Sequence, residues 1–130
     1  MKNQTFSAIF ERLKSILKAY EGPMVEHISV NGALQGQSYE LRDPQNDGWY
    51  GQFAILRVHE KHVSLMVGPL GMEKGLTRDL SPALQKALHG KNTFHLKTAN
   101  EAVFQELSHV IERAFAYYEV FHMNDPFSVS

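Results

Sequence analysis

Residues 52–67 read QFAILRVHEKHVSLMV, and this segment decides the fold. Apolar residues alternate with other residues on both sides of Glu60-Lys61, a spacing typical of the two strands of a half-buried hairpin. A two-residue turn at Glu60-Lys61 makes every cross-strand pair on one face apolar, as such a hairpin requires. These pairs are Val58 with Val63, Leu56 with Leu65, and Ala54 with Val67. Glu-Lys is not a preferred sequence for a two-residue turn, so a longer loop stays an alternative.

Two longer segments carry apolar residues at helical spacing. Between residues 6 and 20, and again between residues 103 and 118, apolar side chains recur on one side of a helix. This pattern predicts two helices that each bury one face. The residues from Thr98 to Glu101 match a capping box, so we expect Thr98 to be the N-cap of the second helix.

The remaining elements are shorter. Residues 25–30, 37–41 and 93–97 are rich in strand-forming residues and lie between turn sequences, which predicts three further strands. Ser81-Pro82 predicts the start of a short helix with Ser81 as its N-cap. Gly90 is expected to end that helix in the left-handed conformation.

This order of elements predicts a single α+β domain over residues 1–130. We expect a mostly antiparallel sheet of about five strands, with the N- and C-terminal helices packed on one face and one short helix before the last strand. The core should combine the apolar faces of the helices and the strands. Its expected members are Phe6, Ile9, Leu13, Ile16, Leu17, Leu56, Val58, Val63, Leu65, Phe94, Leu96, Leu107, Val110 and Ile111.

The composition excludes several classes of function. The chain has 13 Lys and Arg against 14 Asp and Glu, so it lacks the excess positive charge with which proteins bind nucleic acid. It has no cysteine, which excludes disulfides and thiol chemistry. No apolar run approaches the roughly 20 residues of a transmembrane helix, and nothing resembles a signal peptide. We therefore expect a cytoplasmic protein that binds neither nucleic acid nor membrane.

The face of the sheet opposite the helices is the candidate binding surface. The period-two rule places polar and cationic side chains outward on strands whose other residues are needed in the core. These candidate ligand-binding residues are Arg57, His59, His62, Ser64, His95 and Lys97, with the apolar Phe53, Ile55 and Met66 among them. Such a mixture suits a small anionic ligand or an acidic partner, provided that the last strand lies beside the hairpin. An ordinary solvated sheet face is the alternative.

Other patterns favour structural roles. His59 and His62 can approach each other at the hairpin end, but two ligands do not complete a zinc site. Glu106, His109 and Arg113 share one side of the last helix, where surface ion pairing explains them. The glycines match no phosphate-binding loop, and no serine lies in a nucleophile elbow. We therefore expect no metal, no cofactor and no catalytic residue.

Several short sequences in the second half follow the order and spacing of one known family. They are Arg57-Val58-His59-Glu60-Lys61-His62-Val63-Ser64, Pro69-Leu70, Leu80-Ser81-Pro82-Ala83-Leu84 and Gly90-Lys91-Asn92-Thr93-Phe94. Through them, about residues 52–118 resemble the YdhG-like family of domains of unknown function, which has a frataxin-like fold. The chain departs from the family pattern at Met66-Val67-Gly68, where the family has a polar-aromatic stretch. It departs again at Asn92-Thr93, where the family has a Ser-Cys pair, so we interpret it as a divergent member.

Three functions remain in competition. The residues favour a non-enzymatic module that binds a small anionic ligand or a protein partner, which includes self-association as a homodimer. The resemblance implies a second function, a frataxin-type iron-binding chaperone, because iron-chaperone activity has been proposed for some relatives. Iron handling needs clustered carboxylates, whereas the first helix exposes Arg12, Lys14 and Lys18 against Glu11 alone. A minimal acid–base enzyme is the third alternative.

Overall fold

The computed structural model of this chain describes residues 2–21, 26–30, 34, 36–42 and 52–123. Its elements follow the predicted order, with the additions given below. The helices are α1 (Lys2–Lys18), α3 (Pro82–Ala87) and α4 (Glu101–Met123), with short 3-10 helices at Gly68–Gly71 and Lys74–Thr77. The strands are β1 (Glu26–Val30), β2 (Ser38–Arg42), β3 (Gln52–Val58), β4 (Val63–Val67), β5 (Leu88–His89) and β6 (Thr93–Leu96).

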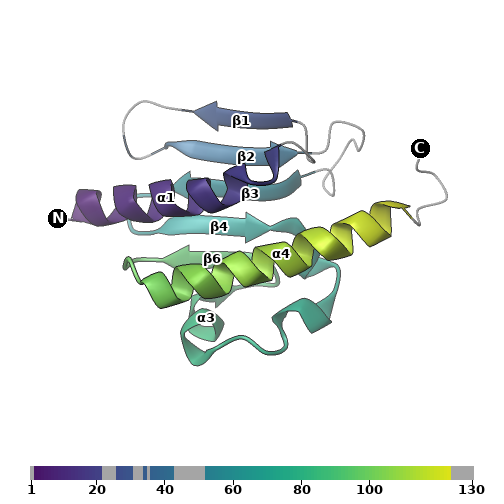
Figure 1. Ribbon diagram of the computed structural model, residues 1–130. Helices are drawn as coiled ribbons and strands as arrows, with labels where there is room; N and C mark the ends of the chain where they lie inside the picture. The colour runs from purple at the N-terminus through teal and green to yellow at the C-terminus, as the bar shows by residue number, and fades with distance from the viewer. Residues whose placement is uncertain (1, 22–25, 31–33, 35, 43–51, 124–130) are drawn as a thin grey trace.

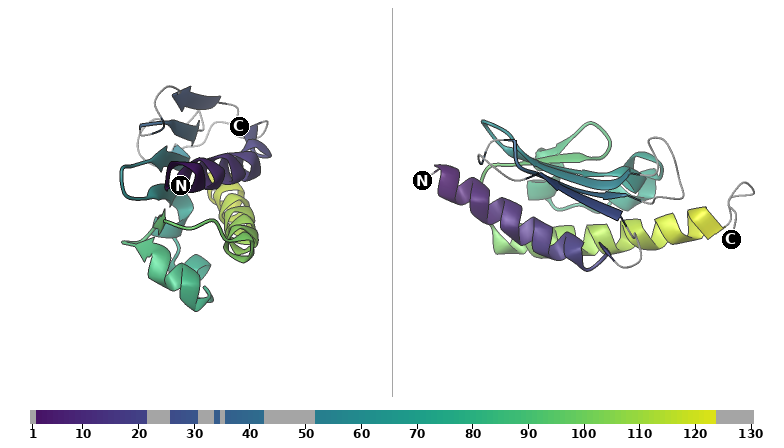
Figure 2. Two further views of the ribbon diagram at one scale, coloured as in Figure 1. Left: turned by 90° about the vertical axis from the view of Figure 1, so that its left-hand side faces the viewer. Right: turned by 90° about the horizontal axis from the view of Figure 1, so that it is seen from above.

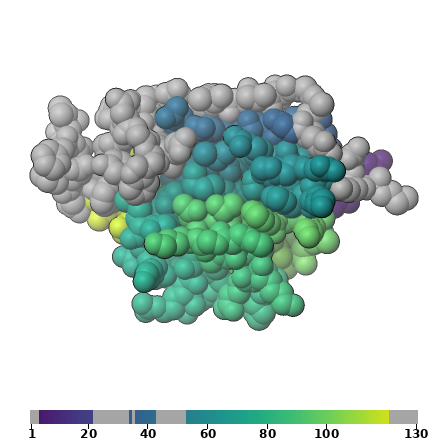
Figure 3. Space-filling model, turned by 180° about the vertical axis from the view of Figure 1, so that it is seen from behind, coloured from purple at the N-terminus to yellow at the C-terminus, as the bar shows by residue number. Residues whose placement is uncertain are grey.

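The strands form one antiparallel sheet in the order β1-β2-β3-β4-β6-β5 (Figure 1). Both long helices, α1 and α4, lie on the same side of this sheet, as the edge-on views in Figure 2 show. The predicted α+β fold is therefore confirmed, with the N- and C-terminal helices on one face and a short helix before the last strand. We call the uncovered side of the sheet the open face; it is the side that Figure 3 shows.

The register of the β3–β4 hairpin is the predicted one. Leu56 lies opposite Leu65, and Val58 lies opposite Val63. The backbone N–H of His59 donates to the carbonyl of His62 at 2.8 Å, so the loop contains only Glu60 and Lys61. The longer loop that was the alternative is not formed.

Strand β6 pairs with β4, the arrangement that the candidate binding surface requires. Ser64 of β4 lies opposite His95 of β6, and Ser64 also lies opposite Arg57 of β3 on its other side. The three side chains therefore form a row across the open face, because residues directly opposite each other point to the same side of a sheet.

The core lies between the sheet and the two long helices. Of the predicted core residues, all are buried except Ile16, which is partly buried and packs against the others. Large side chains that the prediction did not include complete the core. They include Phe10, Tyr39, Leu41, Phe53, Leu84 and Phe104.

The sheet has six strands, because the two-residue strand β5 adds to the five longer strands that the sequence predicts. The short helix α3 ends at Ala87, and Leu88 and His89 pair with Phe94 and Thr93 of β6. The backbone φ of Gly90 is +72°, in the left-handed region as expected. Gly90 makes the turn between β5 and β6, however, and is not the C-cap of α3.

Phe53 lies on the helix side of the sheet, although alternation predicts the open face. The register between β2 and β3 shifts here: Leu41 lies opposite Ala54, and Arg42 lies opposite Gln52. Phe53 is thus the extra residue of a β-bulge, which re-aims its side chain. The ring is fully buried and meets three other aromatic rings at centroid distances of 5.7–6.2 Å. These rings belong to Tyr20, Phe115 and Tyr118.

The bulge can be tested by comparing how substitutions of Phe53 and Ile55 change the stability of the protein. Phe53→Ala removes a buried ring and should lower the free energy of unfolding by about 3–5 kcal/mol. Ile55→Ala acts on the half-buried open face, so its loss should be at most about half as large. Urea denaturation followed by circular dichroism measures both, and equal losses would contradict the bulge.

Candidate functional site

Four histidines stack in one column on the open face. Their order is His59, His62, His95 and His89, with successive ring centroids 4.5, 4.0 and 4.0 Å apart. The angles between successive ring planes are 27°, 21° and 18°, so the rings are close to parallel. We call these four side chains the histidine column.

The strand register explains why these four residues meet. His59 and His62 flank the two-residue turn and join through a backbone hydrogen bond. Ser64 lies opposite His95 in the β4–β6 pair, so His62, two residues earlier, is the diagonal neighbour of His95. His89 lies opposite Thr93 in the β5–β6 pair, which makes it the diagonal neighbour of His95 on the other side. The column therefore crosses four strands obliquely.

Ser64 fixes the end of the column. Nε2 of His59 and Oγ of Ser64 are 2.9 Å apart, within hydrogen-bond distance. A neutral imidazole can either donate to or accept from a hydroxyl, so this contact holds the ring of His59 against the sheet in either tautomer.

The surroundings of His59, His62 and His95 favour their neutral forms. Partial burial lowers the pKa of His59, His62 and His95 below the ordinary value of 6.5. Positive charges act in the same direction: Arg57 lowers the pKa of His59, while Lys97 and neighbouring histidines lower the pKa of His62 and His95. Two charged rings 4.0 Å apart repel by about 1 kcal/mol in water and about 4 kcal/mol at an effective dielectric constant of about 20. Adjacent rings therefore resist being charged together.

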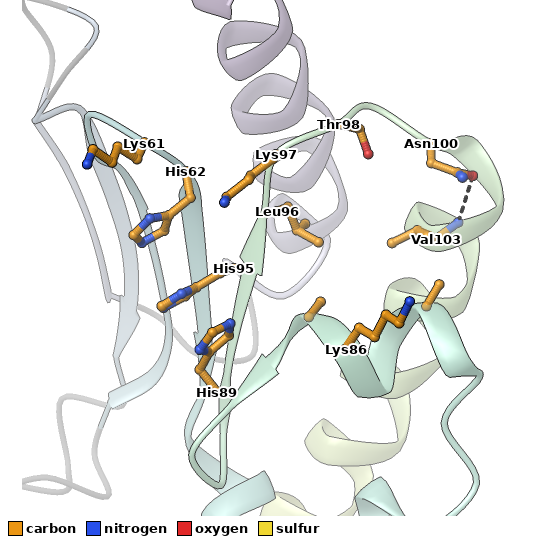
Figure 4. Close-up of a pocket in the computed structure, with 12 residues that line it drawn as sticks. Lys61, His62, Lys86, His89, His95, Leu96, Lys97, Thr98, Asn100 and Val103 are labelled. Atoms are coloured by element: carbon orange, nitrogen blue, oxygen red, sulfur yellow. Dashed lines mark hydrogen bonds between the residues drawn. The ribbon is translucent and has the colours of Figure 1, made fainter.

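A hollow of about 530 Å³ opens beside the column, between the end of the hairpin, β6, α3 and the start of α4 (Figure 4). Three lysines line it, and we call it the lysine hollow: Lys61 from the hairpin turn, Lys86 from α3 and Lys97 from the end of β6. Three members of the column, His62, His89 and His95, line it too. Of the residues that the structure describes, no Asp or Glu is among those that line it.

The rest of the lining is polar on one side and apolar on the other. Thr98 and Asn100 contribute a hydroxyl and an amide where the chain enters α4. Leu96 and Val103 contribute apolar side chains, together with two alanines of α3. The hollow therefore combines cations, hydrogen-bonding groups and a small apolar wall.

Asn100, and not Thr98, is the N-cap of α4. Oδ1 of Asn100 accepts hydrogen bonds from the backbone N–H groups of Ala102 at 3.0 Å and Val103 at 3.3 Å. The prediction for Thr98 is therefore wrong by two residues. Both residue types are good N-caps, and the longer excursion of the chain after β6 leaves Thr98 in the wall of the lysine hollow.

The two carboxylates of α4 nearest its start are engaged elsewhere. Glu101 forms an ion pair with Arg12 of α1 at 2.6 Å, and the hydrogen bond from Arg12 lowers the pKa of Glu101. Glu106 accepts hydrogen bonds from the backbone N–H of Ser81 at 2.9 Å and from its Oγ at 2.6 Å. Both contacts are made outside the lysine hollow, whose lining residues are all neutral or basic.

The contact of Glu106 with Ser81 differs from the surface ion pair that the sequence suggests. Oγ of Ser81 also accepts from the backbone N–H of Leu84 at 3.3 Å, so Ser81 is the N-cap of α3, as predicted. Glu106 thus ties the first turn of α3 to α4. Because α3 carries Lys86, this tie positions one wall of the lysine hollow.

All six predicted site residues lie near one another at this end of the sheet. His62, His95 and Lys97 line the hollow, whereas His59 is in the column outside it. Arg57 and Ser64 lie in the row beside the column. Of the three apolar residues expected among them, Phe53 alone points to the helices.

Three basic residues that line the hollow were not among the predicted site residues: Lys61, Lys86 and His89. His89 lies in a segment that looks like the end of α3, so it carries no strand periodicity. Lys61 lies in the predicted hairpin turn and Lys86 in the predicted short helix, and neither position by itself indicates a binding site. Lys86 lines the hollow because α3 packs against β5 and β6. No local pattern in the sequence indicates this packing.

The column is poorly arranged for a metal ion. A nitrogen lone pair lies in the plane of its imidazole, so nearly parallel rings direct their lone pairs side by side instead of toward one point. Within the described ranges, no group of three or more His, Asp or Glu side chains is placed to hold a metal ion.

In the same part of the chain, no helix is long and apolar enough to cross a membrane.

The position of the N-cap can be tested by two substitutions. Asn100→Ala leaves two backbone N–H groups without an acceptor and should lower the free energy of unfolding by about 1 kcal/mol. Thr98→Ala should change it by less than about 0.5 kcal/mol. Urea denaturation curves compare the two variants, and a larger loss for Thr98→Ala would show that Thr98 caps the helix.

The lowered pKa values predict how stability varies with pH. As the pH falls past 6.5, histidines of the unfolded chain take up protons before His59, His62 and His95 do so in the folded protein. The free energy of unfolding should therefore fall with pH from just above 6.5 until the folded histidines also become protonated. The His62→Gln/His95→Gln variant should lose less stability over this range than the wild type.

Thermal denaturation at several pH values between about 5 and 8 measures this difference. His109→Gln changes an exposed histidine of α4 and serves as the matched control, which should follow the wild type. The same pH dependence in the double variant and the wild type would show that the column does not contribute.

Comparisons with protein-family models, with curated proteins and with solved structures each give no significant match to this chain.

Proposed function

We propose that this protein binds a small anion with two or more negative charges in the lysine hollow, and that it does so without catalysing a reaction. The observation that carries the proposal is that Lys61, Lys86 and Lys97, which come from three separate elements, all line one hollow. Such lysines repel one another when the hollow holds no anion, and an anion between them removes that repulsion.

The geometry favours a compact anion. Ammonium groups are point charges that accept many orientations of a phosphate or carboxylate. Thr98 and Asn100 add hydrogen-bonding groups, and the volume of about 530 Å³ is that of an ordinary small-molecule site. A hollow of this volume, lined by exposed lysines, suits a ligand of the size of a diphosphate or a small sugar phosphate better than an extended chain.

An acidic protein partner uses the same charges in a different way. Such a partner would need a broad basic surface, whereas Glu40 lies on the open face opposite Ile55, outside the cluster of lysines and histidines. Outside the hollow, the open face thus carries both a positive charge at Arg57 and a negative charge at Glu40, whereas the hollow is lined by basic and neutral residues, which favours a small ligand there.

The enzyme alternative depends on the pair of His59 and Ser64. A serine hydroxyl at 2.9 Å from an imidazole is an arrangement that nucleophilic catalysis also uses. Within the described part of the chain, no carboxylate is seen to contact His59, and the pair lies outside the lining of the hollow. The hydrogen bond between His59 and Ser64 holds the ring of His59 against the sheet, so we interpret it as structural.

The iron-chaperone alternative, and the resemblance to the YdhG-like family that raises it, have less support than anion binding. Iron is held by carboxylates grouped around one point. The largest group of titratable side chains at this site is basic, and Glu101 and Glu106 are occupied by Arg12 and Ser81. Membership of that family stays our proposal from the quoted residues.

Inorganic pyrophosphate is the probe for this function. At about pH 7 and low salt, isothermal titration calorimetry should show one pyrophosphate bound per chain, and Lys86→Gln/Lys97→Gln should weaken binding by about tenfold or more. Raising the ionic strength from about 0.01 M to about 0.15 M should also weaken it, because the screening length falls from about 30 Å to about 8 Å.

Lys18→Gln is the matched control, since Lys18 is an exposed lysine at the end of α1, away from the hollow. It should bind pyrophosphate as the wild type does. All three proteins should have free energies of unfolding within about 0.5 kcal/mol of one another. An equal loss of affinity in both lysine variants, or no binding by the wild type, would contradict the proposal.

A further inference from the structure

We propose that the histidine column couples anion binding to proton uptake, so that the protein binds its ligand more tightly at mildly acidic pH and releases it as the pH rises. This inference rests on the proposed function, because it concerns the same hollow. It adds the regulation of that site, which lysines alone do not provide, since they stay charged throughout the physiological range.

The first support is that the column lies in the wall of the hollow. His62, His89 and His95 belong to the column and also line the hollow. Figure 4 shows their rings one after another beside β6. An anion held by the lysines is therefore close to three imidazoles that can each take up a proton. Protonated imidazole is also a hydrogen-bond donor at both nitrogens.

The second support is the charge around the column. Arg57 of β3, Lys61 of the turn, Lys97 after β6 and Lys86 of α3 all contribute positive charge near it. From the α4 side, the lining residues are the uncharged Thr98, Asn100 and Val103. The turn also holds Glu60, which is exposed and is not among the residues that line the hollow.

These charges oppose protonation when the hollow holds no anion. The pKa values of His59, His62 and His95 accordingly lie below the ordinary value. A bound dianion offsets the repulsion and favours the charged rings. Linkage is reciprocal: if the anion raises the proton affinity of the column, protons raise the anion affinity by the same factor.

The stacking order sets how many protons are taken up. Adjacent rings are 4.0–4.5 Å apart and resist a second charge. His62 and His89, however, are separated by the ring of His95. The charge of His89 still lowers the pKa of His62, but repulsion across the intervening ring is weaker than repulsion between adjacent rings, and both residues line the hollow. We therefore expect between about one and two protons to be bound with each anion.

Methanedisulfonate is the probe, because it has the shape of pyrophosphate while its two charges do not change between about pH 5 and pH 8. Any change of its affinity over this range thus comes from the protein. Calorimetry at about pH 5.5 and pH 7.5 should show binding that is tighter at the lower pH by about tenfold or more. Titrations in two buffers with different ionisation enthalpies count the protons taken up.

The His62→Gln/His95→Gln variant should bind methanedisulfonate through its lysines, with a smaller change of affinity between the two pH values and fewer protons taken up than the wild type, because His89 is then the one column histidine left in the described lining. His109→Gln, the matched control, should behave as the wild type does. If the double variant keeps the full pH dependence, or if the wild type binds with no proton uptake, the inference is wrong while the proposed function stands. No binding by the wild type at either pH would overturn the proposed function and the inference together.

A measurement on the wild type alone makes the test independent of any variant. The Cε1–H resonances of the histidines report their titration by NMR, first without and then with saturating methanedisulfonate. His59, His62 and His95 should titrate below the ordinary pKa without the anion and at a higher pH with it. Adding the anion at constant pH should leave the resonance of His109 where it is, and pKa values of His59, His62 and His95 that the bound anion leaves unchanged would overturn the inference.

Discussion

The two-residue turn at Glu60-Lys61 constrains both the core and the site. The hydrogen bond from His59 to His62 fixes the register of β3 against β4. Since side chains alternate between faces, a shift by one residue would bring Arg57 into the core and Leu56 to the surface. The same register places both His62 and Ser64 beside His59. One short turn thereby decides which side chains the helices cover and which ones meet on the open face.

The part of the fold that follows from local periodicity could be predicted. The hairpin register, the apolar faces of α1 and α4, and the cap of α3 at Ser81 all depend on residues close together in the chain, and the structure confirms them. Local periodicity could not predict the residue at which α4 begins, or the side of the sheet on which Phe53 lies. Thr98 and Asn100 both suit an N-cap, and only the path of the chain after β6 decides between them. A bulge at Phe53 interrupts the alternation, and its aromatic partners are distant in sequence: Tyr20 follows the end of α1, and Phe115 and Tyr118 lie in α4.

The site was predictable only in part for a related reason. Alternation places Arg57, His59, His62, Ser64, His95 and Lys97 on one face, but it does not say which strands are neighbours. The pairing of β6 with β4 is a non-local choice. His89 and Lys86 join the site through β5 and α3, which are too short to show periodicity. Tertiary packing therefore assembles the lysine hollow from pieces that look unrelated in the sequence.

Strand β5 has a consequence for how copies of this protein meet one another. A sheet edge presents unpaired backbone N–H and C=O groups, onto which another chain can add a strand. At this edge the outermost strand is only Leu88–His89, and α3 packs against β6 beside it. A second chain finds little template there, and the charges of Lys86 and Lys97 repel an identical copy. The arrangement that forms the lysine hollow thus also protects this edge from strand addition and aggregation.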